Sequence, residues 1–123
     1  METRQLVERY HEAWTSGDFT TARICLTDDL DFRGSIDAFS NADTFLEAVK
    51  RFRRMVNGVT LLQSYYDDEG AALLYDCDTA SPAGVIRTAE FFRVANYKIT
   101  SIRLVFDASE LRKAMPTANT KPA

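Results

Sequence analysis

Two spacings of apolar residues divide the chain into a helical first half and a strand-rich second half. In the first half apolar residues recur every three or four positions, which predicts helices over about 3–15 and 42–56. Gly17 follows the first of these runs, where a glycine is expected just after a helix end. Ser40, with Asp43 three residues later, has the spacing of a capping box and predicts the start of the later helix.

A short helix and a short strand are predicted between the two longer helices. Asp18 is a suitable N-cap for the helix, which closes before the polar cluster 27–29. Its apolar stripe consists of Phe19, Ala22, Cys25 and Leu26. Apolar and charged residues alternate over 30–33, which predicts a short strand that ends at Gly34.

From residue 57 onward the apolar period changes from 3.6 to 2, which predicts strands. Four runs are rich in β-branched and aromatic residues, namely 59–66, 71–79, 84–94 and 98–106. Polar or proline-containing turns separate neighbouring runs, so the strands are predicted to form an antiparallel meander. Helices followed by strands indicate a segregated α+β domain.

Composition places the chain among ordinary globular domains. Of its 123 residues, 46% are hydrophobic and 27% are charged, which is the composition of an ordinary globular protein. A chain of this length can form one domain with its own hydrophobic core. We predict a single domain over 1–115. The segment 116–123 contains two prolines and no large apolar residue, and we predict a flexible C-terminal tail there.

Charge and cysteine content narrow the classes of partner. The net charge of −3 argues against nucleic acid as a partner. The sequence contains neither a run of about 18 apolar residues nor an apolar leader segment, so we predict neither a membrane span nor secretion. Cys25 and Cys77 are not spaced as a redox or metal pair, so we predict buried thiols in a cytoplasmic protein. His11 has no second ligand at metal spacing, and no cofactor is predicted. A histidine on a helix face forms structural hydrogen bonds more often than it acts as a base, and we expect the same of His11.

The order and spacing of several short motifs resemble the nuclear-transport-factor-two-like superfamily, which includes ketosteroid isomerases and SnoaL-like polyketide cyclases. The motifs are Arg9-Tyr10 seven residues ahead of Gly17-Asp18, Leu26-Thr27-Asp28-Asp29-Leu30, Glu90-Phe91-Phe92-Arg93-Val94, and Lys98-Ile99 with Ser101-Ile102-Arg103. The resemblance covers nearly the whole chain. It implies a curved antiparallel β-sheet wrapped around helices, with a cone-shaped cavity between them.

The same resemblance implies two site residues and the loss of a third. Tyr10 matches the tyrosine that donates a hydrogen bond to the substrate oxyanion in ketosteroid isomerases. Glu90 stands where those enzymes have the protonated aspartate that shares this task. Their general base falls on Gly34, which has no side chain to accept a proton. Asp31 and Asp37 are nearby in sequence, and the sequence does not decide whether either faces the cavity.

Glu90 is also unusual on the pattern alone. It interrupts the apolar alternation of one strand face, whose other members are Ile86, Thr88, Phe92 and Val94. If this face is turned inward, Glu90 is buried and protonated with a raised pKa, close to Tyr10. If the face is turned to solvent, Glu90 is an ordinary exposed carboxylate. We favour the inward orientation.

Asp76 and Asp78 share one strand face and so form a candidate carboxylate dyad. A two-residue turn at Pro82-Ala83 places Asp78 opposite Arg87 and Tyr75 opposite Glu90. Pairing with arginine then accounts for the aspartates on the outer face. A register slip of one residue reverses this conclusion.

We therefore predict a SnoaL-like protein that binds an apolar small molecule bearing one or two oxygens. The reactions open to it are those of an isomerase, cyclase or dehydratase, with Tyr10 and Glu90 as acid or oxyanion-stabilising pair. The remaining cavity lining is predicted to be Trp14, Phe32, Phe45, Val49, Phe52, Tyr75, Ile102, Leu104 and Phe106. Two alternatives stay open, a non-catalytic dimeric interaction module and an epoxide-hydrolase-like enzyme, although strand 71–79 lacks the arginine that the second requires.

A homodimer is predicted from apolar residues on the face of the sheet that points away from the helices. Ala89, Phe91 and Val105 fall on that face, and the run 59–62 is also apolar. An exposed patch of this kind favours association with a second copy.

Overall fold

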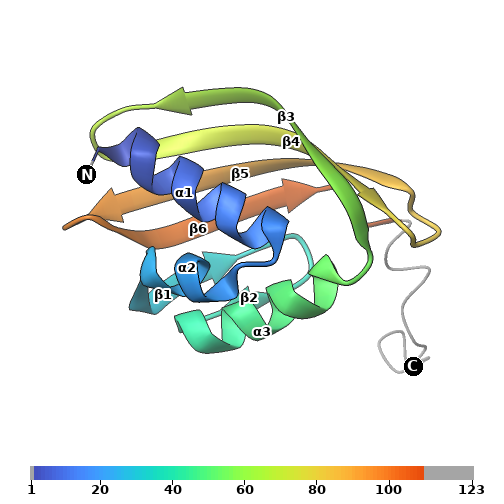
Figure 1. The fold of residues 1–123 in the computed structure, drawn as a ribbon, viewed down its shortest axis with the longest axis horizontal. Coiled ribbons are helices and arrows are strands. Elements are labelled where there is room, and N and C mark those ends of the chain that lie inside the picture. Colours follow the sequence, from blue (N-terminus) through green and yellow to red (C-terminus); the bar gives the residue numbers. More distant parts are fainter. Residues whose placement is uncertain (1, 110–123) are drawn as a thin grey trace.

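The computed structural model describes residues 2–109, and within them a six-stranded sheet curves over three helices (Figure 1). The helices are α1 (Thr3–Ser16), α2 (Phe19–Ile24) and α3 (Ala42–Arg53). The strands are β1 (Leu26–Arg33), β2 (Ala38–Phe39), β3 (Val56–Tyr66), β4 (Gly70–Thr79), β5 (Val85–Ala95) and β6 (Lys98–Phe106). The predicted α+β fold is confirmed. The predicted domain end at 115 and the tail 116–123 lie outside the described residues.

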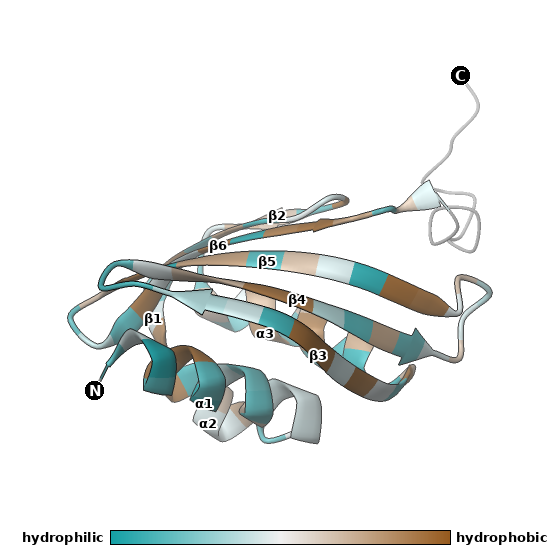
Figure 2. Ribbon diagram, turned by 90° about the horizontal axis from the view of Figure 1, so that it is seen from above, coloured by the Kyte–Doolittle hydropathy of each residue, from teal (hydrophilic) through white to brown (hydrophobic). Residues whose placement is uncertain are grey.

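The sheet has the strand order β2-β1-β6-β5-β4-β3, and its last four strands form the predicted antiparallel meander. One neighbouring pair is parallel: β1 lies beside β6, with Phe32 opposite Ile102. All three helices lie on one side of the sheet (Figure 2). The side chains that the strands alternate toward that side therefore form the core with the helices.

The first helix forms as its sequence pattern predicts. Its buried face consists of the five apolar residues Leu6, Val7, Tyr10, Ala13 and Trp14. Gly17 ends the helix in the left-handed conformation, with φ of 88°, which glycine adopts at little cost. The chain can therefore turn sharply from α1 into α2.

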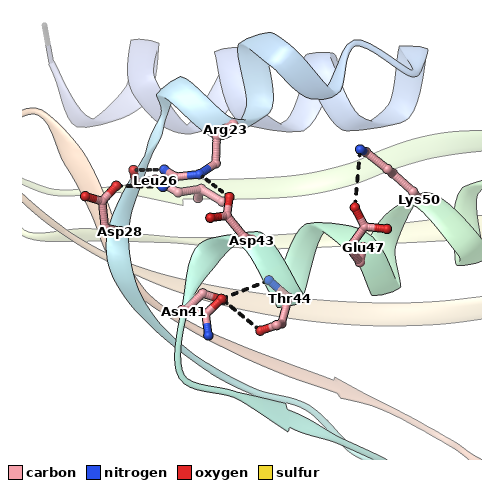
Figure 3. Close-up of polar contacts among 8 residues, drawn as sticks. All are labelled: Arg23, Leu26, Asp28, Asn41, Asp43, Thr44, Glu47 and Lys50. Carbon is pink, nitrogen blue, oxygen red and sulfur yellow. Dashed lines mark hydrogen bonds and ion pairs between the residues drawn. The ribbon is translucent and has the colours of Figure 1, made fainter.

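The predicted boundary of α2 is wrong at its C-terminal end. The helix ends at Ile24, and Leu26 and the polar residues after it belong to β1 instead of a turn. The reason is tertiary, because Leu26 pairs with Ile99 of β6. Arg23 compensates the acidic residues nearby: its guanidinium donates to Asp28 at 2.6 Å and to Asp43 at 2.9 Å (Figure 3).

The α3 helix starts at Ala42 as predicted, but its N-cap residue and its end differ from the prediction. The N-cap is Asn41, whose side chain accepts a hydrogen bond from the backbone N–H of Thr44, so the capping box predicted from the preceding serine is wrong (Figure 3). The helix ends at Arg53 because Val56 already pairs with Thr79 in the sheet. The Arg53 guanidinium then donates to the last-turn carbonyl of Thr15 in α1 at 2.8 Å.

The pairing of β4 with β5 is shifted by two residues from the predicted register. Asp76, not Asp78, lies opposite Arg87, and two hydrogen bonds of 2.8 Å join them. The connection is longer than a two-residue turn, since the Thr79 N–H donates to the Gly84 carbonyl. A shift by two keeps every side chain on its predicted face, because the side-chain period of a strand is two.

Apolar side chains remain exposed on the outer face of the sheet. Phe91 is 48% exposed and Val105 is 57% exposed, while Leu61 and Leu62 of β3 are also accessible. The homodimer stays a prediction. Among the described residues, no helix is both long and apolar enough to span a membrane.

Two strand glycines provide a matched test of the close contact between β4 and β5. A Cβ at Gly70 would collide with the backbone carbonyl of Phe92, whereas a Cβ at Gly58 meets open space. We expect Gly70→Ala to lower the free energy of unfolding by about 1–3 kcal/mol. We expect Gly58→Ala to leave it unchanged or slightly higher. Urea unfolding of both variants tests this, and equal effects would contradict it.

Candidate functional site

A cavity of about 150 Å³ lies between the inner face of the sheet and the helices. Its lining is Tyr10, Trp14, Phe32, Ile36, Asp37, Phe39, Phe45, Ala48, Val49, Phe52, Tyr75, Cys77, Ile86, Thr88, Glu90, Leu104 and Phe106. Every residue in the predicted lining borders it except Ile102. That side chain is fully buried in the core beside Phe92 of β5, so it is not at the cavity wall.

Seven lining residues are absent from the sequence-based prediction. Four of them carried a usable signal: Cys77, Ile86 and Thr88 share the inward face of their strands with Tyr75 or Glu90, and Ala48 lies on the cavity side of α3. The other three, Ile36, Asp37 and Phe39, come from the connection after β1 and from β2. No periodicity marks these positions, because only the tertiary fold brings this segment over the cavity.

Glu90 is the most unusual group in the cavity. It is 2% exposed, and its Oε1 accepts a hydrogen bond of 2.9 Å from the hydroxyl of Tyr75. Among residues 2–109, Oε2 has no protein hydrogen-bond partner and no cation pairs with the carboxyl group. Burial raises the pKa of Glu90 to about 7, against an opposing effect of the Tyr75 hydrogen bond. At neutral pH the carboxyl group therefore carries a proton for much of the time.

Tyr10 reaches the same cavity from α1. It is 1% exposed, its ring packs edge-on against Phe92, and its hydroxyl has no hydrogen-bond partner within the described part of the chain. Burial and the neighbouring Glu90 carboxyl raise the pKa of Tyr10 well above its ordinary value. Tyr10 thus remains a neutral donor. The tyrosine that binds Glu90 directly is Tyr75. The sequence analysis placed Tyr75 opposite Glu90 without giving it a hydrogen bond, whereas in the sheet Tyr75 lies opposite Thr88.

At the family's base position, the loop after β1 brings a different carboxylate to the cavity. A Cβ at Gly34 would lie 3.0 Å from the Phe32 ring and 3.3 Å from a carboxyl oxygen of Asp37. Asp37 itself lines the cavity, and partial burial raises its pKa. Asp31 is instead held by Arg103 at 2.9 Å, outside the cavity lining, and this contact lowers its pKa.

Burial makes His11 a weak base and keeps the two cysteines protonated, so none of the three is a strong base or nucleophile. The His11 ring lies against Trp14 and Tyr75, its Nδ1 has no partner among the described residues, and burial lowers its pKa to about 4. Cys25 and Cys77 are buried free thiols, as predicted, and burial raises the pKa of Cys77 to about 12. Cys77 is therefore a protonated wall residue.

The candidate dyad of Asp76 and Asp78 does not face the cavity. Asp76 is paired with Arg87, which lowers its pKa, and Asp78 is exposed. Within residues 2–109, no three His, Cys, Asp or Glu side chains gather in a way that could hold a metal ion.

The raised pKa of Glu90 makes a prediction about stability. A folded-state pKa of about 7, above the ordinary value of 4.5, means that the unfolded chain ionises first. The contribution of Glu90 to the free energy of unfolding is therefore complete below pH 4.5 and is lost as the pH rises toward 7. Glu90→Gln should match the natural protein at acid pH and exceed its unfolding free energy above pH 7 by about 3 kcal/mol.

Chemical denaturation across this pH range measures the difference. Tyr75→Phe is the companion variant, because loss of its hydrogen bond should raise the pKa of Glu90 further. A difference between Glu90→Gln and the natural protein that does not change with pH would contradict the assigned protonation.

Known proteins provide an independent view of the chain. The sequence matches the family described as SnoaL-like domain over residues 7–102. No curated protein sequence is similar enough to count as a match. Among solved structures, a protein from Kribbella flavida DSM 17836 shares 29% identity with a TM-score of 0.84, covering 96% of each chain.

Two further solved structures share the fold at lower identity. An NTF2-like protein of unknown function from Cytophaga hutchinsonii ATCC 33406 is 18% identical with a TM-score of 0.79, covering 91% of this chain and 96% of its own. An LEH-like epoxide hydrolase from M. tuberculosis is 19% identical with a TM-score of 0.70, covering 89% and 86%. Since the family match extends over most of the chain, from α1 to β6, the protein belongs to the SnoaL-like domain family.

Proposed function

We propose that this protein binds an apolar small molecule bearing one or two oxygens, with a carbonyl oxygen held by protonated Glu90 and by Tyr10. The observation that carries the proposal is a buried carboxyl group with no cationic partner among the described residues, inside an otherwise mostly apolar cavity. A buried carboxyl group whose second oxygen has no hydrogen-bond partner is costly. A ligand oxygen that accepts hydrogen bonds removes that cost.

The donors determine which kind of oxygen fits. Tyr75 already donates its proton to Glu90, so the Glu90 proton and the Tyr10 hydroxyl are the donors left for a ligand. Two donors beside a cavity suit an acceptor such as a ketone oxygen. They would also stabilise the negative charge that develops on that oxygen when a neighbouring C–H bond is deprotonated.

An epoxide-hydrolase reaction is less compatible with this lining. The residues expected for it, an arginine with two aspartates, are not assembled at the cavity, where Asp37 and Glu90 are the acidic side chains of the lining. Asp76 is engaged by Arg87 on the other face of the sheet. We therefore prefer carbonyl binding.

Ligand binding can be followed with the single tryptophan of the chain, Trp14, which lines the cavity. We expect small ketones to change its fluorescence and to bind more tightly than their parent hydrocarbons. The affinity should fall about tenfold between one pH unit below and one above the Glu90 pKa of about 7, because ionisation removes a donor. Glu90→Gln, which keeps an N–H donor, should lose this pH dependence.

Tyrosine variants supply the matched control. Tyr10→Phe should weaken ketone binding by about 0.5–1.5 kcal/mol and leave hydrocarbon binding unchanged. Tyr66→Phe removes a hydroxyl from a half-buried tyrosine outside the cavity lining and should have no effect. Equal binding of ketones and hydrocarbons at every pH would rule out the proposed role of Glu90.

A catalytic function is a second candidate, favoured by the position of Asp37. Its carboxylate borders the cavity beside Gly34, where the family's base would stand, while Tyr10 and Glu90 keep the oxyanion side. In this arrangement Asp37 removes a proton from the carbon next to the ketone and returns it to another carbon of the ligand, which is an isomerisation. The same proton removal is the first step of cyclase and dehydratase reactions.

Exchange of ketone α-protons with deuterated solvent tests this step without requiring the natural substrate. Asp37→Asn should slow protein-dependent exchange by about 10²–10⁴-fold while ketone binding persists. Asp31→Asn is the control, since that carboxylate is tied to Arg103 outside the cavity lining. Exchange that survives in Asp37→Asn would exclude Asp37 as the base and leave ligand binding intact as the function.

A further inference from the structure

We propose that the cavity selects ligands by ring number: it accepts a single six-membered ring carrying one carbonyl oxygen and rejects fused multi-ring ketones. This inference rests on the proposed function and narrows it to a substrate class. It depends on the size and the walls of the cavity, which are independent of the protonation of Glu90.

The first argument is volume. The cavity measures about 150 Å³. In another protein, an engineered apolar cavity of about 150 Å³ holds one benzene molecule. A fused four-ring skeleton is several times larger than benzene, so most of it would remain outside, where it buries no apolar surface in the cavity.

The second argument is that touching aromatic rings limit expansion of the walls. Phe32 and Phe45 are in tilted contact with ring centroids 4.5 Å apart, and the Phe39 ring lies 5.9 Å from the first ring and 6.3 Å from the second. A separate group joins Trp14 to Tyr75 at 6.1 Å and to Phe52 at 6.5 Å. Rings packed at these distances support one another, and displacing one disturbs its partners.

The third argument is the position of the polar groups. Tyr10, Tyr75 and Glu90 are fully enclosed, whereas Asp37 is exposed and lies in the loop between β1 and β2. An oxygen on Glu90 therefore draws the ring bearing it into the enclosed part of the cavity. Additional fused rings would extend toward the aromatic walls or the opening.

Phe39 is the residue that the structure assigns as a size limit. It is half-buried on the two-residue strand β2 at the sheet edge, and its ring contacts the rings of both Phe32 and Phe45. Replacing Phe39 with a smaller residue removes atoms of the cavity wall and should destabilise the fold less than the same substitution at a fully buried ring. Phe19 is a matched control, because it is also half-buried against the core but does not border the cavity.

The test compares three ketones and their parent hydrocarbons by Trp14 fluorescence: 4-methylcyclohexanone, 2-decalone and a four-ring 3-oxo steroid. Apolar area alone would make affinity rise with ring number. We expect the reverse order, with the one-ring ketone about tenfold tighter than the steroid. In Phe39→Ala, 2-decalone should gain about tenfold relative to 4-methylcyclohexanone, and Phe19→Ala should leave this ratio unchanged.

The outcomes separate the two proposals. Ketone binding in which the steroid equals or exceeds the one-ring ketone overturns size selection and leaves the proposed function standing. No preference of any ketone over its hydrocarbon overturns both. If Phe39→Ala unfolds, Phe39→Leu provides the smaller change, and the ligand order in the natural protein decides the question by itself.

Discussion

The inner face of the sheet must be shielded from water, and the helices available to do so are short. α1 and α3 have 14 and 12 residues, while the strands of the meander have 9 to 11. Since a helix rises only about 1.5 Å per residue and a strand about 3.3 Å, the sheet is much longer than its cover. Curvature of the sheet over the helices compensates in part, and a cavity remains where side chains do not meet.

The cost of burying Glu90 follows from this arrangement. Its strand turns the residue inward by simple alternation, and the surrounding core supplies a hydroxyl from Tyr75 but no cation among the described residues. The carboxyl group responds by holding its proton to about pH 7. A protein selected only for stability gains nothing from such a group compared with a glutamine, so its presence at the cavity wall favours a role in binding or chemistry.

The absence of a side chain at Gly34 has a packing explanation. A Cβ at Gly34 would lie 3.0 Å from the Phe32 ring and 3.3 Å from a carboxyl oxygen of Asp37, so a side chain there would press on both. The aromatic wall and a carboxylate at Asp37 are therefore compatible with each other, whereas a larger residue at Gly34 would press on both.

Local pattern alone determined the α+β class and which side chains share one face of each strand, because periodicity depends only on neighbouring residues. It favoured an inward face for Glu90 and Tyr10, and the family resemblance supplied the cavity between the sheet and the helices. Tertiary contacts decided the rest. Parallel pairing with β6 drew Leu26 into a strand, a longer turn set the β4–β5 register, and the path of the chain after β1 brought Asp37 and Phe39 to the cavity. These outcomes depend on residues far apart in sequence, whose pairing no short-range period encodes.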